Sequence, residues 1–219
     1  YAYWAGNKEE HTYRQKIADE KLEYMKFQCD QFEAKVTIPI ASYIYFCHKE
    51  NYYLNDCINT AEKTYNYLKS NTSTMPVILF NGDEYKYLQE WDSKKAILKY
   101  KKDFNVIESN QNKLIKNKKI ELPELKEEAR KFTENLKKSN NFIVKRMIKP
   151  SKIHLSDFGK TFILSLDSDL EEVTFDYDTC DVSMSSESLS FRLKFPFGLD
   201  TTQINGRLQK PKKGNYNNF

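Results

Sequence analysis

The chain has 219 residues, of which 39% are hydrophobic and 30% charged, with a formal net charge of +4. This length suits one large or two small domains with a real core, and the 15 Tyr and 14 Phe argue against a disordered chain. No apolar run approaches the length of a membrane span and no signal-peptide pattern begins the chain, so no membrane partner is expected.

The first residues of the chain are apolar, and the clearest helix of the sequence follows them. Residues 1–4 are apolar enough to be buried, so we expect them to continue a longer fold. Within residues 8–32, apolar side chains recur at spacings of three and four, which predicts an amphipathic helix. Its apolar stripe consists of Ala18, Leu22, Met25, Cys29 and Phe32.

Two apolar runs with a helix between them follow. The run Lys35–Phe46 is β-prone and apolar on both faces, which is typical of a strand inside a parallel sheet, although Pro39 interrupts it. A helix over residues 60–70 has Thr60 as its candidate N-cap, and Met75–Phe80 is a second short strand. The order helix, strand, helix, strand predicts an α/β layer fold.

The positive charge of the chain is concentrated in residues 94–119, which hold nine lysines against two acids. This segment has little periodicity, so we expect a solvated helix end and a lysine-rich linker over residues 101–122. A basic stretch can bind nucleic acid, but only Tyr100 and Phe104 are aromatic here, and a polar linker explains the lysines equally well. Nucleic acid is therefore not expected as a partner.

The rest of the chain predicts a small α+β domain over residues 123–209. Pro123 opens a helix that runs to about Lys138, and another helix begins at Ser185, whose hydroxyl is placed to cap it. Short apolar runs predict strands over 151–155, 161–166, 172–176, 181–184 and 202–208. The polar, asparagine-rich residues 210–219 are expected to be a flexible tail.

His48 follows the run Lys35–Phe46 and allows two interpretations. A lone histidine at the end of a strand can be structural, or it can be a metal ligand, because open α/β sheets bind ligands beyond the carboxyl ends of their strands. As a ligand, His48 would need a carboxylate to orient its imidazole, and Glu50 and Asp56 are the candidates. The other two histidines stand in unrelated contexts, so a complete site would need ligands from outside this sequence.

Residues 1–85 resemble the C-terminal half of a metallo-β-lactamase-fold protein, in the subgroup related to the cytidine-monophosphate sialic acid hydroxylases. The resemblance is carried by "YAYWAGN", the long helix, "IPIASYIYFCHKENYYLND" and "PVILFNGDEY". It implies that residues 1–100 are half of an αββα sandwich. It also implies a metal held mainly by an HxHxDH loop of the other half, with His48 as a late ligand. The HxHxDH motif itself does not occur in this sequence.

Residues 122–208 carry a second resemblance, to a sterol-carrier-protein-2-like domain. The matching stretch is "CDVSMSSESLSFRLKFPFGLDTTQINGRL", in which a strand leads into a capped helix and a closing strand. Such domains can enclose an apolar ligand, or they can be purely structural. Ser185 is interpreted as a helix cap rather than a nucleophile, because no histidine base lies near it in the sequence.

Together these features predict the C-terminal fragment of a metal-dependent hydrolase-like protein. The intact protein would hold zinc or iron, and a metal-bound water would attack an unidentified small-molecule substrate. Tyr45, Tyr52 and Tyr53 would form walls of the substrate pocket. Because most metal ligands are missing, the fragment is expected to be inactive alone and to bind no metal tightly. Its partner would be the missing N-terminal half of the fold.

The alternative prediction is a non-catalytic module that binds a lipid or a protein through the C-terminal α+β domain. Either function is expected in the cytoplasm. The four cysteines are isolated, at positions 29, 47, 57 and 180, and none forms a CxxC pair. Such cysteines are typical of reduced thiols in a cytoplasmic protein.

Overall fold

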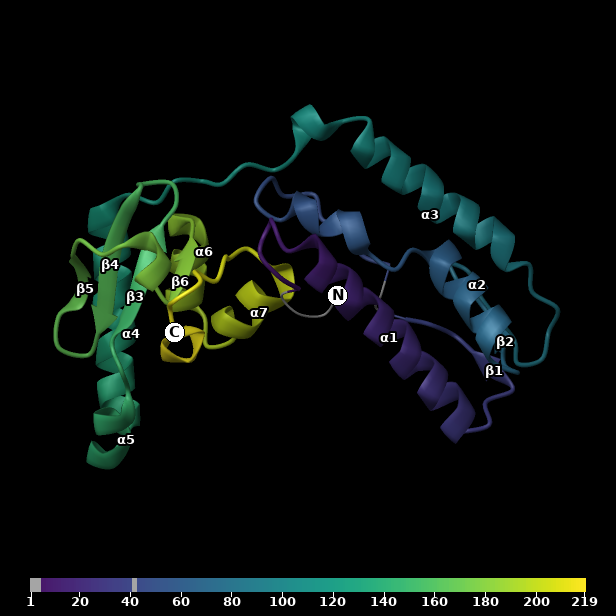
Figure 1. Ribbon diagram of the computed structural model, residues 1–219, viewed down its shortest axis with the longest axis horizontal. Helices are drawn as coiled ribbons and strands as arrows, with labels where there is room; N and C mark the ends of the chain where they lie inside the picture. The colour runs from purple at the N-terminus through teal and green to yellow at the C-terminus, as the bar shows by residue number, and fades with distance from the viewer. Residues whose placement is uncertain (1–4, 41–42) are drawn as a thin grey trace. The chain divides into compact units, whose positions relative to one another are not determined.

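A computed structural model describes residues 5–40 and 43–219, and the chain divides into two compact units (Figure 1). The first unit comprises residues 10–115 together with Ala5, and the second comprises Gly6–Glu9 and Lys116–Phe219. Both units mix helix and strand, in agreement with the coarse α/β prediction. None of the helices within the described ranges has the length and hydrophobicity that a transmembrane span requires. The predicted buried segment 1–4 lies outside the described residues.

The first unit is mainly helical. Its helices and strands are α1 (His11–Gln31), β1 (Val36–Thr37), α2 (Ala61–Asn71), β2 (Met75–Pro76) and α3 (Ser93–Glu108). The predicted first helix is confirmed, and its stripe residues Ala18, Leu22 and Cys29 are buried, whereas Phe32 is 79% exposed. The predicted cap of α2 is also confirmed, because Thr60 Oγ1 accepts a hydrogen bond from the Lys63 amide at 3.1 Å.

The prediction of one buried strand over Lys35–Phe46 is wrong. Only β1 pairs, in parallel with β2, and Ile40 is 77% exposed; positions 41 and 42 lie outside the described residues. Pro39 has no N–H group to donate, so the ladder cannot continue past it.

Further along this run, a side chain replaces the missing neighbouring strand. The side-chain amide of Asn55 accepts a hydrogen bond from the Phe46 N–H and donates one to the Phe46 carbonyl, each at 2.8 Å. Phe46 itself is buried with Leu54 and Ile58 in a small apolar cluster. Apolar patterning therefore predicted burial at Phe46 correctly but not the means by which its backbone is satisfied.

The second predicted strand, Met75–Phe80, shows the same behaviour. Only β2 pairs, although Val77 and Ile78 are fully buried. The Ile78 amide donates to Ser93 Oγ at 3.0 Å, and the Ile78 carbonyl accepts from Trp91 Nε1 at 2.8 Å. With no further strand at hand among the described residues, side chains of the next segment satisfy this buried backbone.

Helix α3 corrects the predicted linker. Residues 101–108 belong to α3, which begins after Asp92, whose carboxylate accepts a hydrogen bond from the Lys94 amide. The helix buries Ala96 and Ile97 and leaves its lysines on the solvent side, so the lysine-rich pattern marks the solvated face of a helix and not a linker. The division between the two units falls after Ile115.

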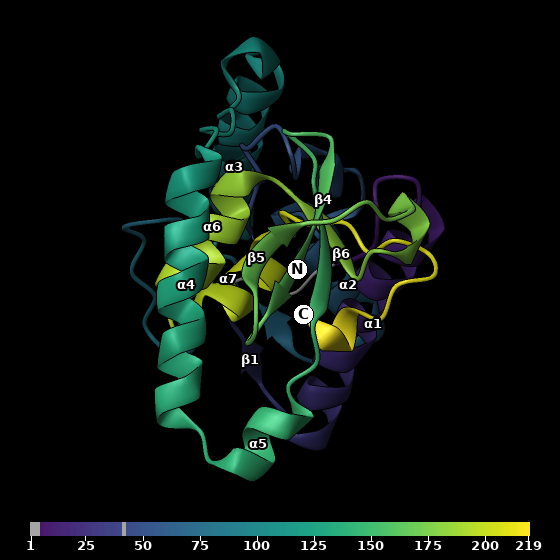
Figure 2. The ribbon, with the colours of Figure 1, turned by 90° about the vertical axis from the view of Figure 1, so that its left-hand side faces the viewer.

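The second unit is a four-stranded sheet with helices against it (Figure 2). Its elements are α4 (Leu122–Ser139), α5 (Phe142–Met147), β3 (Ser151–Leu155), β4 (Lys160–Ser165), β5 (Asp169–Glu172), β6 (Val182–Met184), α6 (Ser186–Lys194) and α7 (Gly198–Asn205). The strand order is β5-β4-β3-β6, antiparallel except for the parallel pair β3–β6. The predicted strand over 151–155 is confirmed, and β4 and β6 lie within one residue of their predicted positions, whereas β5 ends at Glu172, where the predicted strand 172–176 would begin.

The core of the second unit lies between the sheet and helices α4 and α6. Leu125 of α4, Leu189 of α6 and Ile153, Leu155 and Phe162 of the sheet are all completely buried. Helix α4 contacts both α6 and β5. Ser185 caps α6 as predicted, since its Oγ accepts a hydrogen bond from the Ser188 amide.

Two predictions for the end of the chain are wrong. Residues predicted as the strand 202–208 belong mostly to α7, which ends at Gly206 with a φ of 60°. The predicted flexible tail 210–219 instead packs onto the unit: the Asn215 amide bonds Asp181 at 2.8 Å. At Gly214, a Cβ atom would lie 1.8 Å from the Cys180 carbonyl oxygen, so only glycine permits this approach.

Candidate ligand-binding site

The second unit contains a pocket of about 220 Å³ at the end of its core. It is lined by Phe132, Thr133, Leu136, Ile148, Lys149, Ser151, Leu164, Ser165, Leu166, Arg192, Asn218 and Phe219. These residues come from α4, the α5–β3 connection, β3 and β4 with the residue after it, α6 and the C-terminal segment. Apolar side chains predominate, and Arg192 and Lys149 are the two charged residues of the lining.

Arg192 is positioned by the buried face of α6. It follows Ser188 and Leu189 at helical spacings of four and three, and both of these residues are buried. Because it stands in the last turn of the helix, its positive charge also suits the helix dipole. The Arg192 side chain therefore lies on the same face of α6 as the buried residues Ser188 and Leu189.

The guanidinium of Arg192 lies among aromatic rings. Its Cζ atom is 4.9 Å from the centre of the Phe132 ring and 5.9 Å from that of Phe219. Its Nε is buried and has no hydrogen-bond partner, and no acid of the described chain forms an ion pair with it. Burial lowers the pKa of Arg192, while Tyr216 and Asp200 exert only an opposing longer-range electrostatic effect.

The hydroxyl groups of the pocket already have partners within the protein. Thr133 donates to the Asp169 carboxylate, and Ser151 donates to the Asn218 carbonyl. Ser165 Oγ lies 2.9 Å from Ser168 Oγ. The unused donor capacity of the lining is consequently concentrated in its two cations, and of these Arg192 has a buried donor, Nε.

Other cations of the same unit contrast with Arg192. Lys194, two residues further along, lies 2.6 Å from the Glu128 carboxylate. Arg207 lies 2.5 Å from Glu187. An arginine without such a partner, set in an apolar pocket, is suited to bind a carboxylate or phosphate group.

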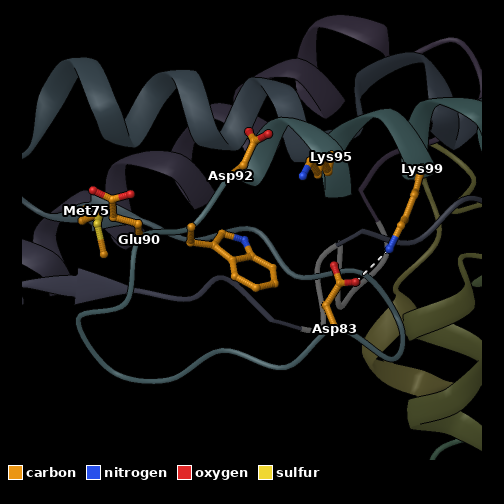
Figure 3. A pocket seen from close by; sticks show the side chains of 7 residues that line it. Met75, Asp83, Glu90, Asp92, Lys95 and Lys99 are labelled. Carbon is orange, nitrogen blue, oxygen red and sulfur yellow. Dashed lines mark hydrogen bonds and ion pairs between the residues drawn. The ribbon is translucent and has the colours of Figure 1, made fainter.

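The first unit contains a wider groove of about 770 Å³, which differs in character (Figure 3). Most of its lining is charged: Asp83, Glu90, Asp92, Lys95 and Lys99, with Met75 and Trp91. Figure 3 shows Asp83 and Lys99 pointing toward each other, with their charged atoms 2.8 Å apart. Because charges of both signs are mixed in an open groove, it defines no particular ligand.

His48 is not at the end of a buried strand, contrary to the prediction. It forms a single β-bridge with Ile115, and its side chain is 11% exposed. Its Nδ1 lies 3.4 Å from the Glu50 amide and 3.9 Å from the Glu50 carboxylate. Glu50 is therefore beside the ring as predicted, but Asp56 is engaged elsewhere.

Asp56 pairs with Arg14, a buried residue of α1 that no sequence motif singles out. Two guanidinium nitrogens of Arg14 bond the two carboxylate oxygens at 2.9 and 2.6 Å. Burial would raise the pKa of Asp56, but the hydrogen bond and charge of Arg14 outweigh it and hold that pKa below its usual value.

The zinc or iron implied by the resemblance does not fit the residues present. Within the part of the chain that the structure describes, one His/Cys/Asp/Glu group has metal-ligand spacing: His11, Asp56 and Cys57. Burial and the neighbouring Asp56 raise the pKa of the Cys57 thiol to about 11, so it is protonated at neutral pH. A cation would also have to compete with Arg14 for the carboxylate. His48 does not belong to this group.

The three tyrosines predicted to wall a substrate pocket make packing contacts within the first unit. Tyr45 and Tyr53 pack against the cluster of Phe46, Leu54 and Ile58, and Tyr45 stacks edge-on with Tyr52. Tyr45 also donates a hydrogen bond to Glu108 at 2.7 Å. The guanidinium of Arg14 lies over the Tyr53 ring. Neither of the two cavities above includes these residues in its lining.

One serine–histidine pair was missed by the sequence analysis. His154 Nδ1 lies 2.9 Å from Ser183 Oγ, because β3 and β6 place the two residues opposite each other. Ser183 is 5% exposed, and its backbone pairs with Gln209. Burial also lowers the pKa of His154. A hydroxyl so enclosed cannot meet a substrate, so the contact joins two strands rather than forming a nucleophile and base.

No protein-family model, curated protein or solved structure matches this chain. The candidate site therefore depends on its own geometry. A signal for Arg192 existed in the sequence: a cation at helical spacing from Leu189, on a face expected to be buried. The aromatic and apolar partners around it come from segments distant in sequence and could not be paired with it beforehand.

Proposed function

We propose that the second unit binds a small anionic amphiphile, a molecule with a short apolar body and a carboxylate or phosphate head. The observation that carries this proposal is Arg192, a cation set between Phe132 and Phe219 with a buried Nε that has no partner. The guanidinium would bind the anionic head, and the apolar side chains would cover the body.

The size of the pocket limits the ligand. A volume of about 220 Å³ is below the roughly 300–1,000 Å³ typical of sites for drug-sized molecules, which favours a short acyl or aromatic acid over a complete lipid. The resemblance of residues 122–208 to sterol-carrier-like domains is in keeping with an enclosed apolar ligand. This function corresponds to the binding-module alternative.

The metal-dependent hydrolase function is a weaker proposal. It would require ligands from outside these residues, since only Glu50 accompanies His48 and Asp56 is bound to Arg14. Exposed apolar side chains on the first unit, such as Phe27 and Ile40, are what an absent half of a sandwich would cover. No catalytic step can be derived from the residues present.

Octanoate and its neutral isostere octanamide provide the test. Isothermal titration of the full chain should show octanoate binding at least about tenfold more tightly, because a hydrogen bond to a charged group contributes roughly 1.5–3 kcal/mol. Arg192→Met should remove this preference, and Arg192→Lys should retain part of it, since a lysine keeps the charge but loses the planar fork.

Arg146→Met is the matched control. Arg146 also stacks on a phenylalanine, with its Cζ 5.9 Å from the Phe142 ring, but it is exposed and does not line the pocket. It should leave the octanoate preference unchanged. Equal binding of the two probes by the wild-type chain, or an undiminished preference in a folded Arg192→Met variant, would refute the proposal.

A further inference from the structure

Helix α5 exposes an apolar face at one end of the second unit. Phe142, Ile143 and Met147 are 72%, 70% and 73% exposed, and Val144 is 39% exposed. In Figures 1 and 2 the helix lies at the end of α4 that extends beyond the sheet. Within the described chain these side chains stay largely in solvent, whereas core residues of the same unit such as Leu125 are completely buried.

The segment of the chain that contains α5 carries positive charge alone. Residues 137–149 contain five cations and no acid: Lys137, Lys138, Lys145, Arg146 and Lys149. None of the five forms an ion pair with an acid of the described residues. This differs from the middle of α4, where Arg130 is paired with both Glu127 and Glu134.

We infer that α5 docks the second unit onto an anionic lipid bilayer surface. Phe142, Ile143 and Met147 would enter the boundary between headgroups and acyl chains, and the five cations would lie among anionic headgroups. The combination of exposed aliphatic and aromatic side chains with basic residues is that of an interfacial anchor, not of a membrane span. The lack of a transmembrane helix among the described residues bears only on crossing the bilayer, not on binding to its surface.

The charge of this surface favours an anionic bilayer over a second copy of the chain as the binding partner of α5. Two copies meeting through α5 would bring ten cations together with no acid from either α5 surface, which is unfavourable. An anionic bilayer supplies the opposite charge and also a medium for exposed apolar side chains. The inference stands on α5 alone and does not depend on the ligand proposed for the pocket.

Vesicle flotation of the full chain tests the inference. Binding to phosphatidylcholine vesicles with about a third phosphatidylserine should exceed binding to pure phosphatidylcholine by at least about tenfold, and it should weaken with added salt. Replacing Lys145 and Arg146 together by Gln should lower partitioning by about 25-fold, since each basic residue near the surface contributes about fivefold. Phe142→Ala with Ile143→Ala should lower it at least about tenfold.

The matched control is the pair Phe27→Ala and Phe32→Ala on and beside α1. These phenylalanines are 55% and 79% exposed, but two acids, Asp30 and Glu33, stand close to them in the sequence. The control pair should bind vesicles like the wild-type chain. An equal loss in the control would mean that any exposed aromatic pair has this effect, and it would overturn the role of α5.

Depth of insertion gives a second readout that does not depend on loss of binding. Ile143→Trp adds a probe on α5, and its signal is the difference from the wild-type chain, whose two tryptophans are Trp4 and Trp91. Its fluorescence should shift to the blue with anionic vesicles and be quenched by brominated lipids. A wild-type chain that ignores both vesicle types, or an Ile143→Trp probe that stays in water on bound vesicles, would overturn the inference. Binding to an acidic protein without vesicle binding would do the same.

Discussion

The two units bury similar kinds of residues but complete their backbone hydrogen bonds differently. In the second unit, four strands pair along ladders of three to five residues and cover a core that includes Leu125, Ile153 and Leu189. In the first, each strand has two residues, and Asn55, Trp91 and Ser93 side chains satisfy the extended segments instead.

This difference shows that an extended segment can be buried without belonging to a regular β-strand. A buried extended segment needs partners for its N–H and C=O groups, but a strand is only one source of them. A ladder distributes those bonds over many residues, whereas a single Asn or Ser side chain supplies one or two. We therefore expect the second unit to tolerate the loss of one polar side chain better, and to depend more on its apolar packing.

The largest effect is expected from shortening a buried leucine in the second unit. Leu125→Ala should cost about 3–5 kcal/mol of unfolding free energy, because Leu125 is completely buried between α4 and the core. Leu68→Ala, also completely buried but in the first unit, where the strands have only two residues each, should cost about 2–3 kcal/mol, since surroundings without long ladders can collapse further into the cavity. Segment-resolved hydrogen exchange reports each unit separately.

Leu98→Ala is the control for this pair. Leu98 lies on α3 and is 64% exposed, so the same substitution should change stability by less than about 0.5 kcal/mol. If Leu68→Ala costs as much as Leu125→Ala, the proposed difference in packing between the two units is wrong.

A smaller effect is expected from the ion pair of the first unit. Asp56→Asn removes the carboxylate that Arg14 binds with two nitrogens. Breaking a buried pair costs about 3–5 kcal/mol, but the Asp56 side chain is 33% exposed, so we expect about 1–3 kcal/mol. Denaturant unfolding of the variant at neutral pH measures this difference.

The pH dependence of the same pair has a definite sign. Because the pKa of Asp56 is lowered in the folded chain, the carboxylate contributes stability above its ordinary pKa of about 3.9. That contribution is lost as the pH falls through the lower, folded-state pKa. The gap in stability between wild type and Asp56→Asn should accordingly shrink below about pH 4. A gap that stays constant down to pH 2 would mean that the hydrogen-bond geometry, not the charge, is what the variant loses.

Sequence patterns predicted local features well and long-range pairings poorly. The stripe of Ala18, Leu22 and Cys29 and the cap at Ser185 depend on neighbours within one helix, and both are confirmed. The run Lys35–Phe46 failed because apolarity predicts burial without saying which group bonds Phe46. Among the candidate site residues, His48 could be selected from the sequence because histidine is rare in it. Arg192 can be recognised as a candidate only from its contacts with Phe132 and Phe219, which are distant in sequence.

The smallest expected effect compares one helix cap from each unit. Thr60→Ala removes the acceptor of the Lys63 amide at the start of α2, and Ser185→Ala removes that of the Ser188 amide at the start of α6. Each should cost about 1 kcal/mol. Ser185 is completely buried and also donates to Ser188 Oγ at 3.2 Å, so its loss should be the larger of the two.

In this comparison, the unit in which stability is lost matters more than the size of the loss in free energy. If the units hold separate cores, Thr60→Ala should speed amide exchange in α1 and α2 and leave β3 and α6 unchanged, and Ser185→Ala should do the reverse. Thr60→Gly and Ser185→Gly serve as controls, since glycine at an N-cap typically costs only a few tenths of a kcal/mol. Equal acceleration of exchange in both units by either alanine variant would show a single cooperative fold. The separate hydrogen-bonding patterns of the two units would then have no consequence for stability.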